Sequence, residues 1–204
     1  MKPIIILKYL SFFLLFILGS FLFAFYFKWR IDPAQTGKAF IIIAGSLMTC
    51  WIGVGFLSIL ISRKLVFKKN DNFNFYNPFQ LAINGYLHNE IGTEKAKKFK
   101  TAFSLVAFPL FFILVFLFFK ITDYYEDYQL ENFGQNKEIK IEKILWDKGG
   151  QRAFFNFEFE GNKINKIKYS DDSLKVGQKA EIIFSANNPY IIKWKSEILN
   201  KKIN

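Results

Sequence analysis

Three long apolar runs without a single charged residue dominate the first part of the chain. They cover residues 9–27, 39–62 and 101–119. A hydrocarbon core about 30 Å thick needs roughly 20 residues of apolar helix to cross it. Each run therefore predicts a transmembrane helix, and together they predict a membrane domain over residues 1–119. The first run is longer than the apolar part of a cleavable signal peptide, about 7–15 residues, so we expect it to be retained.

The periodicity changes from helical to alternating after residue 135. In the clearest case Phe155, Phe157 and Phe159 alternate with polar residues and are followed by Gly161-Asn162, a typical hairpin turn. Similar alternation occurs around 139–141, 167–169, 180–184 and 190–194, with turn-forming residues in between. The pattern predicts about five short strands in a small C-terminal all-β domain over residues 136–196, an OB-like or SH3-like barrel or a sandwich. An acidic juxtamembrane linker over 120–135 would precede it, and a tail over 197–204 would follow.

The connection between the second and third runs, residues 63–100, is too long for a structureless loop. Asn77 is suited to cap a helix that has Pro78 at its first position. We predict an amphipathic helix over residues 78–91 on the inner leaflet; the alternative is a docking element for a cytoplasmic partner. Basic residues on both sides of it are expected to meet anionic lipid headgroups, namely Lys68, Lys69, Lys95, Lys97, Lys98 and Lys100.

The distribution of Lys and Arg predicts the orientation in the membrane. Residues 63–100 carry eight basic residues, all near the two apolar runs that this segment connects, whereas residues 28–38 carry three. Because basic loops stay in the cytoplasm, the N-terminus and the 63–100 connection are predicted to be cytoplasmic. The acidic stretch after residue 119 agrees with an extracytoplasmic position for the C-terminal domain of a multi-pass protein of the cytoplasmic (inner) membrane.

Few side chains in the apolar runs suggest chemistry. Gly45, Thr49 and Gly53 follow one another at intervals of four residues, and such a stripe of small residues lets another helix approach closely. Packing within the chain is one interpretation of the stripe; homodimerisation or partner docking is the other. Tyr26 and Trp29 at the end of the first run are predicted to be interfacial anchors.

Composition and charge narrow the function classes. The net charge is +11, but only three of the 28 basic residues are Arg, and no nucleic-acid-binding motif is present, so we expect no nucleic-acid partner. The single cysteine, Cys50, and the single histidine, His88, allow neither an intramolecular disulfide nor a zinc site. The four acidic residues of 120–135 are interpreted as a solvated flank. We therefore predict no enzyme activity, no catalytic residue, no cofactor and no metal.

A short stretch near the C-terminus resembles a known family. Val176-Gly177 opens a run of alternating residues, and Asn188-Pro189 follows it after a short interval. Residues 134–194 thereby resemble a bacterial domain-of-unknown-function family, number thirty-five ninety-two in words; Gln178 departs from its pattern, where Asp is expected. The resemblance implies a membrane-anchored β-domain without an established activity. A second resemblance is to the membrane-plus-OB-domain group of NfeD-like proteins.

These observations favour a non-enzymatic integral membrane protein. Its small extracytoplasmic β-domain would interact with a membrane or envelope protein, or with a second copy, in an accessory or scaffold role in a bacterial envelope. Two alternatives stay open at this point. One is an immunity-type protein that neutralises a membrane or periplasmic toxin, and the other is a small channel or transport subunit.

Overall fold

The computed structural model of the chain describes residues 3–30, 36–67, 86–147, 150–170 and 174–198. The elements are α1 (Pro3–Arg30), α2 (Thr36–Val66), α3 (Tyr86–Ile91), α4 (Thr93–Phe133), β1 (Gly134–Asp147), β2 (Gly150–Phe159), β3 (Asn162–Ser170), β4 (Lys179–Ser185) and β5 (Ile192–Trp194). The chain divides into a helical unit, Met1–Phe25 with Phe40–Phe119, and a β unit, Tyr26–Ala39 with Lys120–Asn204.

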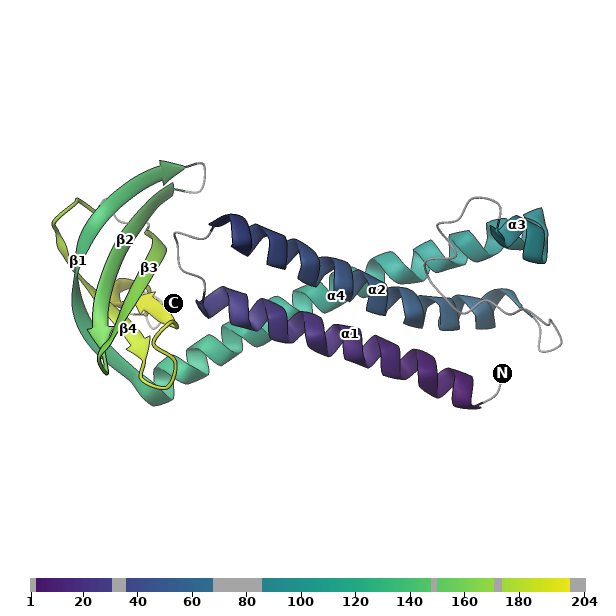
Figure 1. Cartoon of the computed structure of the whole chain (residues 1–204), viewed down its shortest axis with the longest axis horizontal. Helices are drawn as coiled ribbons and strands as arrows, with labels where there is room; N and C mark the ends of the chain where they lie inside the picture. The colour runs from purple at the N-terminus through teal and green to yellow at the C-terminus, as the bar shows by residue number, and fades with distance from the viewer. Residues whose placement is uncertain (1–2, 31–35, 68–85, 148–149, 171–173, 199–204) are drawn as a thin grey trace. The chain divides into compact units, whose positions relative to one another are not determined.

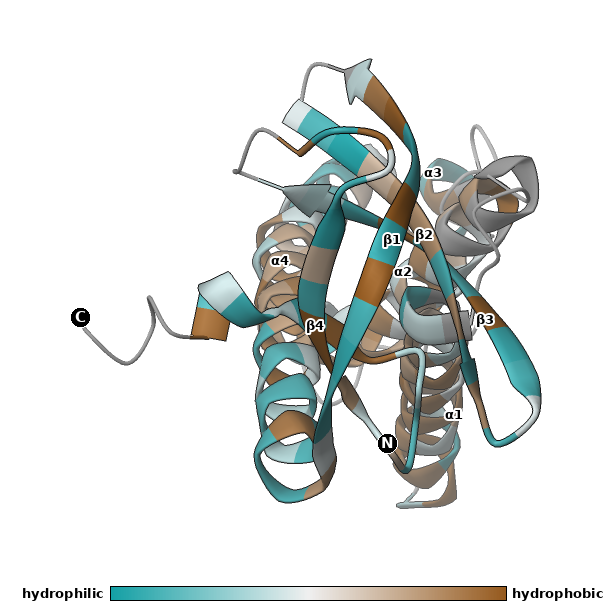
Figure 2. Ribbon diagram, turned by 90° about the vertical axis from the view of Figure 1, so that its left-hand side faces the viewer, coloured by the Kyte–Doolittle hydropathy of each residue, from teal (hydrophilic) through white to brown (hydrophobic). Residues whose placement is uncertain are grey.

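The three long apolar helices are confirmed. Stretches long and apolar enough to cross a membrane lie in Pro3–Tyr26, Ala44–Val66 and Thr93–Phe133. Large apolar side chains stay exposed along all three helices, for example Leu15 at 65%, Met48 at 70% and Phe112 at 64%. The ribbon in Figure 2 shows many residues of hydrophobic colour along the long helices. In a membrane protein this surface is satisfied by lipid rather than by a protein core.

Helix α4 is longer than the apolar run that predicts it. It extends over 41 residues to Phe133, so most of the stretch predicted as a juxtamembrane linker is helical. The sequence contains no helix-breaking residue between Pro109 and Gly134 that would end the helix earlier. At Gly134 the chain turns from helix to strand so tightly that a Cβ there would overlap the carbonyl oxygen of Leu130. Only glycine fits this transition without rearrangement.

Inside the helical unit, α2 packs closely against α1. A Cβ at Gly53 would lie 2.8 Å from Cβ of Phe16, whereas a Cβ at Gly45 would meet nothing within 4 Å. One turn from Gly53, the hydroxyls of Thr49 and Ser20 are hydrogen bonded at 2.8 Å. Two of the three residues in the predicted small-residue stripe, Thr49 and Gly53, therefore contact α1 of the same chain.

Helix α3 is the described part of the predicted amphipathic helix; residues 78–85 of that prediction lie outside the described residues. Leu87 of α3 is 1% exposed and belongs to one buried cluster with Tyr9, Leu60 and Phe99. The apolar side of this part is thus covered by the long helices. Its position on an inner leaflet stays a prediction.

The β unit contains one five-stranded antiparallel sheet in the order β3-β2-β1-β4-β5. The first half of β1 pairs with β4, and the second half pairs with β2, with an irregularity between Ile141 and Lys143. A bulge of this kind bends a strand and increases its twist. The sheet curls around the bend into a half-barrel (Figure 1). The predicted small all-β domain of about five strands is confirmed, with an open half-barrel in place of a closed barrel or a two-sheet sandwich.

The concave face of the half-barrel carries the core that the alternating pattern predicts. Its buried members come from all five strands: Ile139, Ile141, Ala153, Phe155, Phe157, Ile164, Ile182, Phe184 and Trp194. The aromatic rings contact one another, with centroids 5.4 Å apart for Phe155 and Trp194 and 5.0 Å apart for Phe157 and Phe184. Because strand side chains alternate between faces, the residues between these core positions point to the convex side.

Candidate functional site

The edge strand β3 presents backbone groups that the sheet does not use. Glu160 and Gly161 both have positive φ, 50° and 75°, and form the two-residue turn between β2 and β3. In such a hairpin the pair flanking the turn, Phe159 and Asn162, exchanges hydrogen bonds, and every second pair does so after it. The N–H and C=O groups of Lys163, Asn165, Ile167 and Tyr169 therefore point away from β2.

Three of these four residues have open backbone positions. Among the described residues, the groups of Lys163, Asn165 and Ile167 that face away from β2 have no further backbone hydrogen bond. The fourth carbonyl, that of Tyr169, accepts a hydrogen bond from Trp194 Nε1 at 2.6 Å. The open part of the edge is thus a three-residue segment whose ends lie at Lys163 and Ile167.

Side chains close the gap between the two edge strands of the half-barrel, β3 and β5. Beside the Trp194–Tyr169 hydrogen bond, Lys168 forms an ion pair with Glu197 at 3.1 Å. The ammonium of Lys166 lies 5.7 Å from the ring centroid of Tyr190. We call these three contacts the seam. Since none of these three contacts is a backbone–backbone hydrogen bond, the seam can open at less cost than a backbone ladder.

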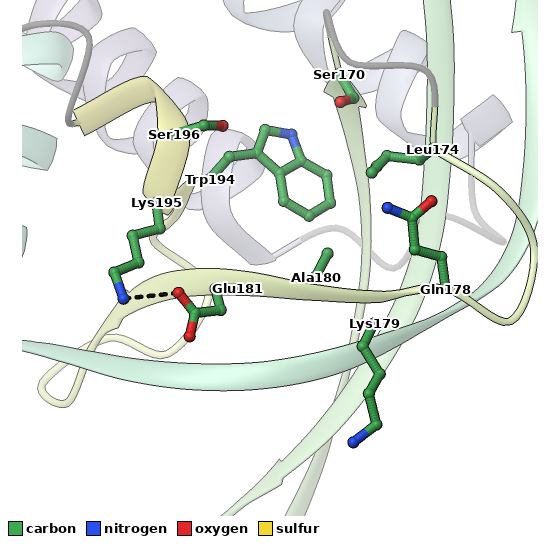
Figure 3. A pocket seen from close by; sticks show the side chains of 9 residues that line it. All are labelled: Ser170, Leu174, Gln178, Lys179, Ala180, Glu181, Trp194, Lys195 and Ser196. Carbon is green, nitrogen blue, oxygen red and sulfur yellow. Dashed lines mark hydrogen bonds and ion pairs between the residues drawn. The ribbon is translucent and has the colours of Figure 1, made fainter.

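A depression of about 440 Å³ lies at one end of the seam (Figure 3). The indole of Trp194, the side chain of Leu174 and Ala180 form its apolar wall, and the amide of Gln178 points between them. Lys195 and Glu181 form a 2.6 Å ion pair at the rim, and Lys179 points away from the depression. This lining combines apolar surface with a neutral amide, two serine hydroxyls and the charged groups at the rim, a composition that can bind a small ligand.

A polar cluster joins the end of α1 to the acidic part of α4 within the β unit. Lys28 lies 3.4 Å from Asp123 and 3.1 Å from Glu126. Trp29 is 5% exposed and donates a 2.9 Å hydrogen bond from Nε1 to Glu126. Trp29 is therefore buried, which corrects its prediction as an interfacial anchor. The acidic residues, which the sequence suggested were merely solvated, hold two chain segments together.

Lys166 extends this cluster to the sheet. Its ammonium donates a 3.2 Å hydrogen bond to the carbonyl oxygen of Trp29, near the C-terminus of α1. Burial lowers the pKa of Lys166 to about 8; Glu126 opposes this shift and Lys168 adds to it. A cation at a helix C-terminus is favourable, but here the loss of hydration outweighs that contribution.

We expect the substitution Lys166→Met to stabilise the β unit at pH 7. The ordinary Lys pKa is 10.5, so between about pH 8 and 10.5 the unfolded chain holds a proton that folded Lys166 has lost. Stability of the natural chain should therefore rise with pH across this window. A shift of this size corresponds to at most about 3 kcal/mol, or about 2 kcal/mol after allowing for solvent screening.

The measurement is thermal unfolding of the full chain in detergent at pH 7 and near pH 10. Lys166→Met should unfold at a higher temperature than the natural chain at pH 7, and the rise between the two pH values should largely disappear. Lys163→Met, an exposed position on the same strand, is the matched control and should leave both unchanged. An unchanged pH profile in Lys166→Met would contradict the assignment.

The turn residues behind the family resemblance have structural roles. Gly177 has φ +85° and lies inside a turn in which the N–H of Gln178 bonds to the carbonyl of Lys175 at 3.1 Å. Such a turn needs positive φ at its third residue. Asn188-Pro189 forms the turn from β4 to β5, where the N–H of Ile191 bonds to the Asn188 carbonyl at 2.9 Å. Val176, the second residue of the first turn, is 63% exposed.

The predicted basic residues fall into two groups. Lys68 and Lys69 lie outside the described residues. Lys95, Lys97, Lys98 and Lys100 are exposed in the first turns of α4. Lys98 pairs with Glu94 at 2.6 Å. Their contact with lipid headgroups stays a prediction.

The sequence did not predict the hydrogen bond between Lys166 and Trp29, because the two residues are 137 positions apart. One signal of a polar contact was present in the sequence. Lys166 and Lys168 occupy the alternating positions that carry apolar residues in the other strands. Lysines on the inward face of a strand indicate that something polar covers that face. In the described part of the chain, no group of three or more His, Cys, Asp and Glu side chains is placed to hold a metal ion.

A scan against protein-family models, a search of curated proteins and a search of solved structures returned no match to this chain. The fold and the site define the class, a membrane protein with three apolar helices and a half-barrel β unit. The resemblance to family thirty-five ninety-two stays a prediction.

Proposed function

We propose that this protein is a non-enzymatic, multi-pass protein of the cytoplasmic membrane that uses its β unit to bind a membrane or envelope protein outside the cytoplasm. The partner contributes an extended segment that adds a strand to the open edge of β3. The observation that carries the proposal is the row of outward-facing backbone groups at Lys163, Asn165 and Ile167. Strand addition satisfies such groups directly, and backbone hydrogen bonds supply its affinity.

One observation supports the three crossings, and a second supports the proposed orientation. Three membrane crossings bring the ends of α1 and α4 to the same side, which agrees with the ion pairs from Lys28 to Asp123 and Glu126. Lys28 is also one of only three basic residues that oppose the positive-inside assignment. Its pairing with carboxylates reduces the opposing charge. The β unit then lies opposite the basic 63–100 connection.

The charges on β3 favour a partner of a particular chemistry. Lys163, Lys166 and Lys168 are its ionisable cations, and the strand contains no carboxylate. Of these, Lys163 is exposed, whereas Lys166 is half-buried and Lys168 pairs with Glu197. A second copy would bring its own Lys163 to the same edge, where like charges facing each other are destabilising. An extended segment with acidic side chains would instead gain favourable pairs. The expected partner is thus a different protein, with an acidic strand-forming segment.

The test uses photo-crosslinking in cells with the full chain. A photoreactive amino acid at Lys163 should give a discrete adduct whose peptide, identified by mass spectrometry, is acidic and belongs to the extracytoplasmic part of a membrane or envelope protein. The same group at Glu158 is the matched control. Glu158 is exposed and pairs with Lys163, but its backbone lies inside the sheet. It should give no such adduct.

A pair of variants at Asn165 tests the mode of binding. The N–H of Asn165 faces away from β2, so Asn165→Pro removes a donor only from the open edge and keeps the ladder. We expect Asn165→Pro to reduce the Lys163 adduct by about ten-fold or more, the equivalent of one or two hydrogen bonds. Asn165→Ala keeps the N–H and should retain the adduct. Equal capture by both variants at unchanged thermal stability, or capture of only a second copy, would refute the proposal.

A further inference from the structure

A cavity of about 250 Å³ lies between α1 and α2 inside the helical unit. Four side chains of α1 and one of α2 line it, namely Ile5, Lys8, Tyr9, Phe12 and Phe56. Tyr9 is buried, at 4% exposed, whereas Lys8 is exposed and the other three are half-buried. The cavity therefore opens on the outer surface of the helix pair.

Aromatic rings from both helices form the wall of this cavity. Phe12 of α1 and Phe56 of α2 are stacked, with ring centroids 5.0 Å apart and planes inclined by 17°. The rings of Phe16 and Tyr9 lie 6.2 Å and 6.0 Å from that of Phe56. Three rings of α1 thus hold Phe56 in place, so the apolar wall exists before any ligand binds.

Lys8 places an isolated cation at this wall. Its ammonium lies 5.9 Å from the centroid of the Phe12 ring. Neither α1 nor α2 contains an acidic residue, and among the described side chains no carboxylate pairs with Lys8. A charge in apolar surroundings is costly unless it is paired. Lys8 is thus suited to an anion that comes from outside the chain.

We propose that the cavity binds one anionic phospholipid, whose phosphate pairs with Lys8 while part of one acyl chain lies against Phe12 and Phe56. The occupant follows from the surroundings, because α1 and α2 are both long and apolar enough to cross a membrane. Lys8 lies only about 8 Å along the helix from Pro3, so its flexible stem can carry the ammonium to the depth of the headgroups. Anionic headgroups attract such a lysine more strongly than zwitterionic ones.

Native mass spectrometry of the full chain tests the charged half of the site. The protein is stripped of lipid in detergent and titrated with phosphatidylglycerol or phosphatidylcholine. We expect one phosphatidylglycerol to bind about five-fold more tightly than phosphatidylcholine, and Lys8→Gln to abolish this preference. Lys64→Gln is the matched control, since Lys64 is exposed in the last turn of α2 and does not line the cavity. It should keep the preference.

The apolar half of the site is tested by filling the cavity. Ile5→Trp places a larger side chain in it and should weaken phosphatidylglycerol binding by about ten-fold or more. Ile4→Trp is the matched control, because Ile4 is 77% exposed and does not line the cavity. A second measurement does not depend on a variant that folds. In the natural chain, phosphatidylglycerol with a photoreactive group on its acyl chain should label peptides that contain Phe12 or Phe56.

Several results would overturn the proposal. They are equal lipid preference in Lys8→Gln and the natural chain, labelling confined to other peptides, and displacement of the lipid by inorganic phosphate alone, which has no acyl chain. Binding that appears only at high protein concentration would assign the cavity to a neighbouring copy and would also overturn it. None of these measurements involves the β3 edge, so this proposal and the proposed function fail independently.

Discussion

Phe155→Ala is expected to destabilise the β unit by about 3–5 kcal/mol. Phe155 is 1% exposed at the centre of the concave core, and its ring contacts that of Trp194 with centroids 5.4 Å apart. Truncation removes the buried apolar area and leaves a cavity, because β2 is held between β1 and β3 and cannot collapse into it. The loss is a large fraction of the roughly 5–15 kcal/mol that stabilises a typical domain.

Hydrogen exchange of β2 and β3 amides in the full chain measures this effect locally. Their protection should fall by more than two orders of magnitude in Phe155→Ala, which is what about 3 kcal/mol corresponds to. Phe154→Ala is the matched control, since Phe154 is the adjacent residue and lies on the convex side beneath Lys143. It should change protection by less than about ten-fold. Equal losses in both variants would show that the two faces of β2 are assigned wrongly.

Gly53→Leu is expected to separate α1 from α2. A Cβ at this position already lies 2.8 Å from Cβ of Phe16 and 3.3 Å from the carbonyl oxygen of Phe13, so a branched side chain has no space. Overpacking of this kind costs about 1–3 kcal/mol, and more where backbone is in the way. Gly45→Leu, two turns earlier on the same helix, meets nothing within 4 Å and should be tolerated.

Cysteine crosslinking between α1 and α2 reports on this separation. The hydroxyls of Ser20 and Thr49 are 2.8 Å apart, so cysteines at both positions, with Cys50→Ser, should form a disulfide in mild oxidant. The crosslink should persist with Gly45→Leu and be lost with Gly53→Leu. If Gly53→Leu kept the crosslink while Gly45→Leu altered the oligomeric state, the stripe would serve contacts between copies instead.

Local composition predicted the membrane helices and the strands for a simple reason. Whether a segment partitions into lipid depends on its own 20 or so residues, so the three charge-free runs were sufficient. The alternation of Phe155, Phe157 and Phe159 likewise reports which face of a strand is buried. The end of the third helix did not follow from its apolar run, because helix α4 continues through a charged segment that contains no helix breaker before Gly134.

The candidate site depends instead on partners that are distant in sequence. The alternating pattern could not reveal that β1 changes partner from β4 to β2 at its bulge, and this change decides which strand is left as an edge. The burial of Trp29 and the lowered pKa of Lys166 follow from a contact across 137 positions. Sequence alone thus determined where the chain meets lipid and which residues form strands, since those properties are local. Tertiary structure decided which backbone edge stays open and which charges are buried, because both depend on how distant segments meet.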